Sequence, residues 1–204
     1  MANTAEQLVP AAALDCAAAR KPMRADARRN YDKLLAAARA EFASRGAGAS
    51  LEEIARRAEV GVGTLYRHFP TRQALLEAVY VEEVMALCRS AEDFAAASPW
   101  GALTDWLSRF VDYVATKRAL AEEMMTTMSK DAPVFRTCHD AIFATGEPLL
   151  ARAKSEGVVR DDVEFLDVIQ LVSGITMVRN ATPEQMKRVL AVALDGLRYG
   201  VDAG

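Results

Sequence analysis

Residues 50–80 read SLEEIARRAEVGVGTLYRHFPTRQALLEAVY, and this stretch decides more about the fold than any other part of the chain. Its pattern predicts two short helices joined by a tight turn, followed by the start of a longer helix. The second short helix carries Thr64, Tyr66, Arg67 and His68. Two helices joined in this way form a helix-turn-helix, in which the first helix braces the second and the second enters the DNA major groove. The stretch therefore predicts a DNA-binding segment.

Capping residues and helix breakers predict where these helices begin and end. Ser50 followed by Glu53 forms a capping box, which satisfies two backbone amides at the start of a helix. Pro70 stops the second short helix, and Thr71 caps the longer helix, which we expect to run to about residue 94.

Helical periodicity continues over nearly the whole chain, and strand patterns are nearly absent. We therefore expect an all-α fold of about nine helices, three of which form a basic head. Asp161 and Glu164 are expected to cap the helix that follows them, and Gly146 with Pro148 favours a bend or a break. Outside residues 50–94, the expected helices are about 25–45, 98–116, 119–128, 133–155, 163–179 and 183–199.

Composition narrows the class of protein. The chain has 204 residues, of which 51% are apolar, so it is long enough for one large domain or two small ones. No apolar run approaches the length that crosses a bilayer, and the first residues lack the pattern of a secretory signal. We expect a cytoplasmic protein with no membrane partner.

The three cysteines, Cys16, Cys88 and Cys138, are an odd number at wide spacing. This spacing argues against a disulfide framework and against a metal site, and no cofactor motif is present. Reduced, mostly buried thiols are the favoured interpretation, and a redox switch is the alternative.

Charge is distributed unevenly along the chain. The net charge is -3, but residues 20–72 contain 12 Lys and Arg against 6 Asp and Glu. Residues 73–204 contain 13 basic and 20 acidic residues. A basic head on an acidic body is the charge distribution expected when a DNA-binding module joins a second domain of different function.

The pattern ASLEEIARRAEVGVGTLYRHFPTRQALLEAV resembles the N-terminal domain of TetR-family transcriptional regulators. The match covers about residues 28–80, and its most specific parts are the Leu-Tyr-x-His-Phe string, the Ala-Glu-Val-Gly turn and the downstream Arg-x-x-Leu. The resemblance implies an all-helical DNA-binding regulator whose remaining helices bind a small molecule and form a dimer.

The resemblance and the motif together assign eight residues to DNA binding. Thr64 lies in the first turn of the recognition helix, where it can meet a base edge or a phosphate. Relatives often have a basic residue where Val62 stands, so Arg67 is expected to share the reading of bases. Tyr66 and His68 are expected at phosphates, with helix packing as the alternative. The full set is Ser50, Val62, Gly63, Thr64, Tyr66, Arg67, His68 and Arg72, the last placed at a helix N-terminus that favours phosphate.

A stripe of aromatic and Met side chains follows Pro99. Such a stripe is usually core, but the resemblance implies that it also lines an inducer site, which would be mostly apolar with a few polar groups. Arg109, Tyr113 and His139 are the candidates for orienting a ligand. The expected ligand-binding set is Trp106, Arg109, Phe110, Tyr113, Met124, Met128, Phe135, His139 and Phe143.

The last two helices have wide apolar faces, which predict a four-helix interface between two copies of the chain. Intramolecular core is the alternative. A homodimer also suits DNA binding, because two recognition helices span successive major grooves. The expected interface residues are Leu166, Ile169, Val172, Ser173, Thr176, Val189, Ala193 and Leu197.

These patterns combine into one prediction. The chain is expected to have an N-terminal arm (1–24), a helix-turn-helix domain (25–72), and a ligand-binding and dimerisation domain (73–204). The expected function is a homodimeric repressor that a small-molecule inducer of unknown identity releases from a double-stranded DNA operator. The alternatives are a DNA-bound scaffold that recruits a protein, and a helical ligand binder without DNA binding. No catalytic motif surrounds His68 or His139, so we do not expect an enzyme.

Overall fold

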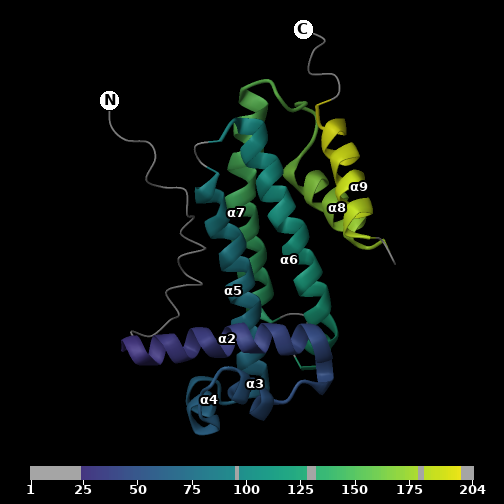
Figure 1. The fold of residues 1–204 in the computed structure, drawn as a ribbon. Coiled ribbons are helices and arrows are strands. Elements are labelled where there is room, and N and C mark those ends of the chain that lie inside the picture. The colour runs from purple at the N-terminus through teal and green to yellow at the C-terminus, as the bar shows by residue number, and fades with distance from the viewer. Residues whose placement is uncertain (1–23, 95–96, 128–131, 179–181, 199–204) are drawn as a thin grey trace.

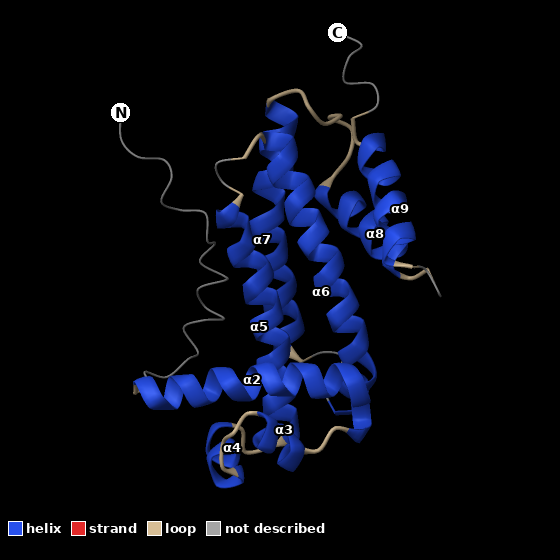
Figure 2. Cartoon of the chain, in the orientation of Figure 1, coloured by secondary structure: helices blue, strands red, loops and turns tan. Residues whose placement is uncertain are grey.

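The computed structural model describes residues 24–94, 97–127, 132–178 and 182–198. Within these ranges the protein has eight α-helices, one 3-10 turn and no strand (Figure 2). The all-α prediction is confirmed, and the number of helices is close to the expected nine. The elements are α2 (Ala25–Arg45), η1 (Gly46–Gly48), α3 (Leu51–Arg57), α4 (Val62–His68), α5 (Arg72–Asp93), α6 (Pro99–Thr127), α7 (Pro133–Ser155), α8 (Phe165–Thr176) and α9 (Pro183–Gly196).

The helices form a small head and a longer body. In Figure 1, α2 lies across the lower end of α5, with α3 and α4 beneath it. Helices α5, α6 and α7 run lengthwise as a bundle, and α8 and α9 pair with each other beside α6. Helix α5 packs against α2 at one end and against α6 and α7 along its length, so one rigid element joins head to body. None of the helices in the described ranges has the length and apolar character needed to span a bilayer.

The head is held together by an apolar core and one buried carboxylate. Leu34, Phe42 and Ile54 are fully buried between α2 and α3. Glu41 is also fully buried, and its two oxygens lie 3.0 Å from Arg45 and 3.1 Å from Arg57. A buried carboxylate is tolerated only with such partners. Because Arg57 belongs to α3, the cluster fixes the bracing helix against α2.

The predicted end of a helix near residue 116 is wrong, because α6 continues without interruption to Thr127. Lys117, Arg118 and the residues after them are good helix formers, so the sequence contains no physical reason for a break. The apolar stripe of the helix also continues, since Leu120 and Met124 are buried. The predicted separate segment at 119–128 is therefore the second half of α6.

The expected break at Gly146 and Pro148 is wrong, because α7 runs continuously through both residues. The bend stays a prediction. Proline removes one helical hydrogen bond, but the helix persists because packing holds it. A Cβ at Gly146 would lie 2.1 Å from the ring of Phe165 and 2.8 Å from Trp106. Gly146 is thus the place where two aromatic rings approach the helix backbone.

Two predicted caps are also corrected. The capping box before α8 is formed by Glu164 and Asp167, not by Asp161 and Glu164, and α8 spans Phe165–Thr176 and not the expected 163–179. The capping box at Ser50 is half formed. Its hydroxyl accepts a hydrogen bond from the Glu53 amide at 3.3 Å, but the Glu53 carboxylate accepts from Arg56 Nε at 2.9 Å instead of returning to Ser50. Helix α9 begins at Pro183 as expected and ends at Gly196.

Candidate functional site

The turn between α3 and α4 sets the angle at which α4 leaves the head. The Val60 amide donates to the Ala55 carbonyl at 3.0 Å, and the Glu59 amide donates to the Arg56 carbonyl at 3.1 Å. These two bonds form a Schellman motif, whose left-handed position is occupied here by Glu59 with φ of 54°. Fully buried Leu65 then anchors α4 to the core. The turn and this anchor leave one face of α4 at the surface.

The exposed face of α4 carries most of the predicted DNA-binding residues. Val62 and Tyr66 are 38% and 42% exposed, high values for apolar and aromatic side chains. Gly63 and Arg67 are exposed beside them, and Thr64 is half-buried. Arg67 lies back along the helix, donating to the Thr64 hydroxyl at 3.1 Å and to the Gly63 carbonyl at 3.3 Å. The arrangement places an aromatic ring, a hydroxyl and a guanidinium on one outward surface.

His68 lies at the inner edge of this face. Its ring meets Tyr31 of α2 edge to face, with centroids 5.8 Å apart, and Tyr31 also packs against Phe69 at 5.0 Å. Packing between α2 and α4 therefore explains the position of the His68 ring, and its contact with a DNA phosphate remains a prediction.

Arg72 has a structural role that the sequence pattern did not predict. Its guanidinium donates to the carbonyls of Ala49 and Gly46 and lies over the Phe42 ring, 5.1 Å from the centroid. These contacts fasten the first residue of α5 to η1, immediately before the bracing helix. The predicted phosphate contact of Arg72 stays a prediction, and so does any contact of Ser50 beyond its capping bond.

Many basic side chains of the head are paired with carboxylates. Besides the two arginines on Glu41, pairs join Lys33 to Glu59 and Arg56 to Glu53. Arg67 differs, because the two groups that it contacts are uncharged. The positive charge of the head that is not paired with carboxylates is therefore spread unevenly over its described surface, and Arg67 places part of it on α4. Arg20 and Lys21 of the N-terminal arm lie outside the described residues.

A cavity of about 560 Å³, within the range of small-molecule sites, lies among α5, α6, α7 and α8. It is lined mainly by apolar and aromatic side chains. Five residues of the expected ligand-binding set line it: Phe110, Tyr113, Phe135, His139 and Phe143. The other lining residues are Tyr80, Val114, Lys117, Arg118, Ile142, Ile169, Ser173, Thr176 and Met177.

Three other members of the expected ligand-binding set lie elsewhere. Trp106 is fully buried and stacks on Phe110 with centroids 5.9 Å apart, so it supports the cavity wall from behind. Met124 is buried in the core, and Arg109 lines a separate recess beside Glu83 and Asp93. Met128 lies outside the described residues.

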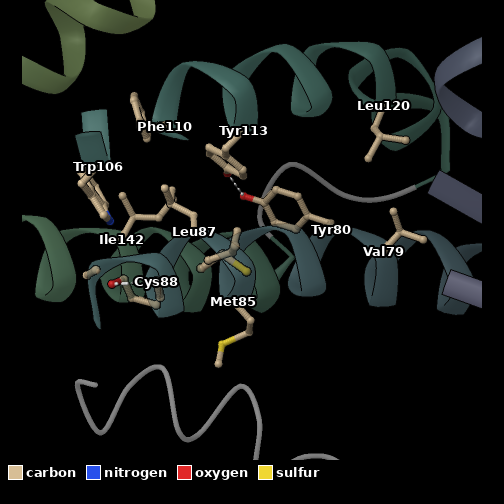
Figure 3. Close-up of a cluster of buried hydrophobic side chains, with 14 of the residues drawn as sticks. Val79, Tyr80, Met85, Leu87, Cys88, Trp106, Phe110, Tyr113, Leu120 and Ile142 are labelled. Carbon is tan, nitrogen blue, oxygen red and sulfur yellow. Dashed lines mark hydrogen bonds between the residues drawn. The ribbon is translucent and has the colours of Figure 1, made fainter. Parts of the chain in front are cut away.

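The cavity touches the helix that reaches the head. The Tyr113 hydroxyl donates to the Tyr80 hydroxyl at 3.2 Å, as Figure 3 shows, and Phe135 meets Tyr80 edge to face at 5.5 Å. Burial raises the pKa of Tyr113 well above its usual range, so the phenol stays protonated as a donor. Tyr80 belongs to α5, and thus one side of the cavity is part of that helix.

Comparisons with known proteins find matches for the head and for the body. Residues 34–79 match the family model described as bacterial regulatory proteins, tetR family, and residues 98–199 match the SbtR-like transcriptional regulator C-terminal domain. The TetR transcriptional regulator SCO0520 from Streptomyces coelicolor is 38% identical, with a TM-score of 0.73 over 82% of this chain and 98% of that one. A TetR regulatory protein from Mycobacterium vanbaalenii is 36% identical, with a TM-score of 0.73 over 87% and 99%. No curated protein sequence matches.

The chain belongs to the TetR family. It is a TetR-family transcriptional regulator, as the Leu-Tyr-x-His-Phe string implied.

This TetR-family chain also presents an apolar surface on its last two helices. Of the predicted interface residues, Leu166 and Val189 are 45% and 40% exposed, and Ile169, Ser173 and Ala193 are half-buried. The remaining three, Val172, Thr176 and Leu197, are buried within the protomer. The sequence pattern missed four further exposed apolar residues, which lie on these helices or just after α8: Leu171, Met177, Val178 and Val192.

Neither the thiols nor the acids of this regulator form a metal site within the described ranges. No group of three or more His, Cys, Asp or Glu side chains there is arranged to hold an ion. Cys88 and Cys138 are buried, and the Cys88 thiol donates to the Ala141 carbonyl at 3.5 Å. Cys16 lies outside the described residues.

Proposed function

We propose that this regulator is a homodimeric repressor that leaves its operator when a small molecule occupies the cavity among α5, α6, α7 and α8. The observation that carries the proposal is the position of Tyr80. It lines the cavity, and it lies on the same helix as Arg72, which is bonded to η1 of the head. The two residues are eight positions apart, or about 12 Å along the helix axis.

The mechanism follows from that connection. A ligand that contacts Tyr80 and Tyr113 changes the packing between α5 and α6, and a shift of α5 moves the head through Arg72. The second half of α6 also contacts η1 and α2, so the cavity reaches the head along two helices. The ligand changes DNA affinity only by the difference between its affinities for the two arrangements.

Dimerisation completes the proposal. Two recognition helices must lie one helical turn of DNA apart to bind both half-sites of an operator, and a two-fold dimer supplies that spacing. We assign the interface to α8 and α9, because large apolar side chains are exposed there and an exposed apolar patch marks an interaction surface. The assembly would act on cytoplasmic DNA.

Replacing Val192 with Asp tests the assigned interface. The side chain is 72% exposed in the protomer, so the substitution leaves the fold intact. In a two-fold interface it buries two unpaired carboxylates, and we expect the dimer dissociation constant to rise by about 100-fold or more. Sedimentation equilibrium measures this constant. Ala115→Asp, on the exposed side of α6, adds the same charge and should leave the dimer unchanged.

A thermal-shift screen tests ligand binding. A compound that binds the folded protein raises its melting temperature, and binders are then added to the protein–DNA complex. The proposal expects at least one binder that dissociates the complex. If no compound raises the melting temperature and a protein partner is captured instead, the function is that of a DNA-bound scaffold.

A further inference from the structure

The charged side chains that line the cavity are all basic in the described part of the chain. They are Lys117 and Arg118 of α6. No described carboxylate belongs to the lining. Asp140 pairs with His139 at 3.5 Å, but both side chains are largely exposed and Asp140 does not line the cavity.

Lys117 is placed to meet a ligand. Its ammonium lies 5.8 Å from the centroid of the Tyr80 ring, on the cavity wall. The side chain as a whole is solvent-exposed, but desolvation of its ammonium among the aromatic groups lowers the pKa of Lys117. A negative group of a ligand beside Lys117 would oppose this lowering of its pKa, because an opposite charge favours the protonated amine.

Arg118 is already oriented by the protein. Its guanidinium donates to the Thr176 carbonyl at 2.7 Å, which holds it between α6 and α8. One such bond uses a single N–H of the five that a guanidinium carries. Lys117 lies toward Tyr80 of α5 and Arg118 toward Thr176 of α8, and both border the cavity, so this edge of the cavity is positively charged.

The remaining walls are apolar. The apolar walls come from three helices, α6, α7 and α8. They are formed by Phe110, Ile142, Phe143 and Ile169. Phe143 is in turn held by the stacked His139 ring at 4.3 Å and by Phe165 at 5.2 Å. Such walls bury a ring system or a hydrocarbon chain.

We propose that the cavity selects an amphipathic organic anion, with its apolar part among these walls and its acid group at Lys117 and Arg118. This inference rests on the proposed function, since it assigns the chemical class of the inducer. A cationic ligand meets two like charges, and a neutral one forms no charge-assisted hydrogen bond with either cation. An anion forms charge-assisted hydrogen bonds, which are stronger than neutral ones.

The test is isothermal titration calorimetry on the full-length protein without DNA, with three probes that share one ring system. They are 2-naphthylacetate, 2-(2-naphthyl)ethanol and 2-(2-naphthyl)ethylammonium. We expect the carboxylate to bind about ten-fold tighter than the alcohol or more, and the ammonium to bind weakest. In Lys117→Met, which keeps the alkyl stem, the carboxylate should lose that advantage while the affinity for the alcohol stays nearly constant.

Arg109→Met is the matched control, because it removes one positive charge from the same helix outside the cavity lining. It should leave the preference for the carboxylate intact. Three results overturn the inference: equal or tighter binding of the alcohol, an unchanged preference in Lys117→Met, or no binding of any probe. The titration contains no DNA, so failure of operator binding or release would refute the proposed function and leave the calorimetric result unchanged. Failure of the calorimetric test would refute the proposed ligand class and leave the DNA-binding result unchanged.

Discussion

Gly146→Ala is expected to destabilise the protein by about 2–4 kcal/mol, although alanine normally stabilises a helix relative to glycine by about 1 kcal/mol. The new Cβ would lie 2.1 Å from one atom of the Phe165 ring and 2.6 Å from another. Relief requires Phe165 to move, but its ring is packed against both Trp106 and Phe143. The expected loss in melting temperature is about 5–12 °C for a chain of this size.

Thermal unfolding followed by circular dichroism at equal protein concentration measures the change. Gly196→Ala is the control, because a Cβ there meets nothing within 4 Å. It should be neutral or slightly stabilising. Equal melting temperatures for Gly146→Ala and the parent protein would show that the aromatic contact at α7 is not tight, contrary to the packing described above.

The second large effect concerns the exposed face of α4. We expect the double variant Tyr66→Ala and Arg67→Ala to bind DNA about 100-fold more weakly or worse, since it removes the ring that we expect at a phosphate and the cation that we expect at base edges. Both side chains are exposed, and among the described residues Arg67 bonds to groups of its own helix, so folding should be unaffected. Fluorescence anisotropy with labelled DNA measures the affinity, and circular dichroism checks the fold.

The control for this variant is Arg136→Ala, which removes a positive charge from the exposed surface of α7 in the body. It should leave DNA affinity within about two-fold, because screening limits a distant exposed charge at physiological salt. A double variant with undiminished DNA affinity would show that α4 is not the recognition helix.

Local signals in the sequence were enough to predict the head. Ser50, Pro70 and Thr71 act over one helical turn, and the helices that they delimit begin or end within one residue of the prediction. The body was predicted less well, because its helices are stabilised by contacts far apart in sequence. Gly146 is the clearest example: a local breaker signal is outweighed by the rings of Trp106 and Phe165, which no local pattern places there.

The difference between local signals and long-range contacts also explains which cavity residues could be predicted from the sequence. The pattern identified Phe110 and Tyr113, because aromatic side chains on one helix face are visible in sequence. It missed Lys117 and Arg118, because the helix was expected to end near residue 116 and they were assigned to no face. In the continuous α6 they follow Phe110 at helical spacing and line the same cavity. Tyr80 was missed for a different reason, since only the tertiary packing of α5 brings it to the wall.

Residues 50–80 also leave the DNA sequence undetermined, because Val62 and Gly63 carry no polar group for reading bases. The most direct test of the account is a gel shift with DNA from upstream of this protein's own gene, against DNA of equal length and composition in scrambled order. We expect a retarded complex containing two protomers, which forms on the upstream DNA at concentrations at least ten-fold below those needed for the scrambled DNA. Equal affinity for the two, or no complex with either, would contradict the assignment of this protein as a dimeric operator-binding repressor.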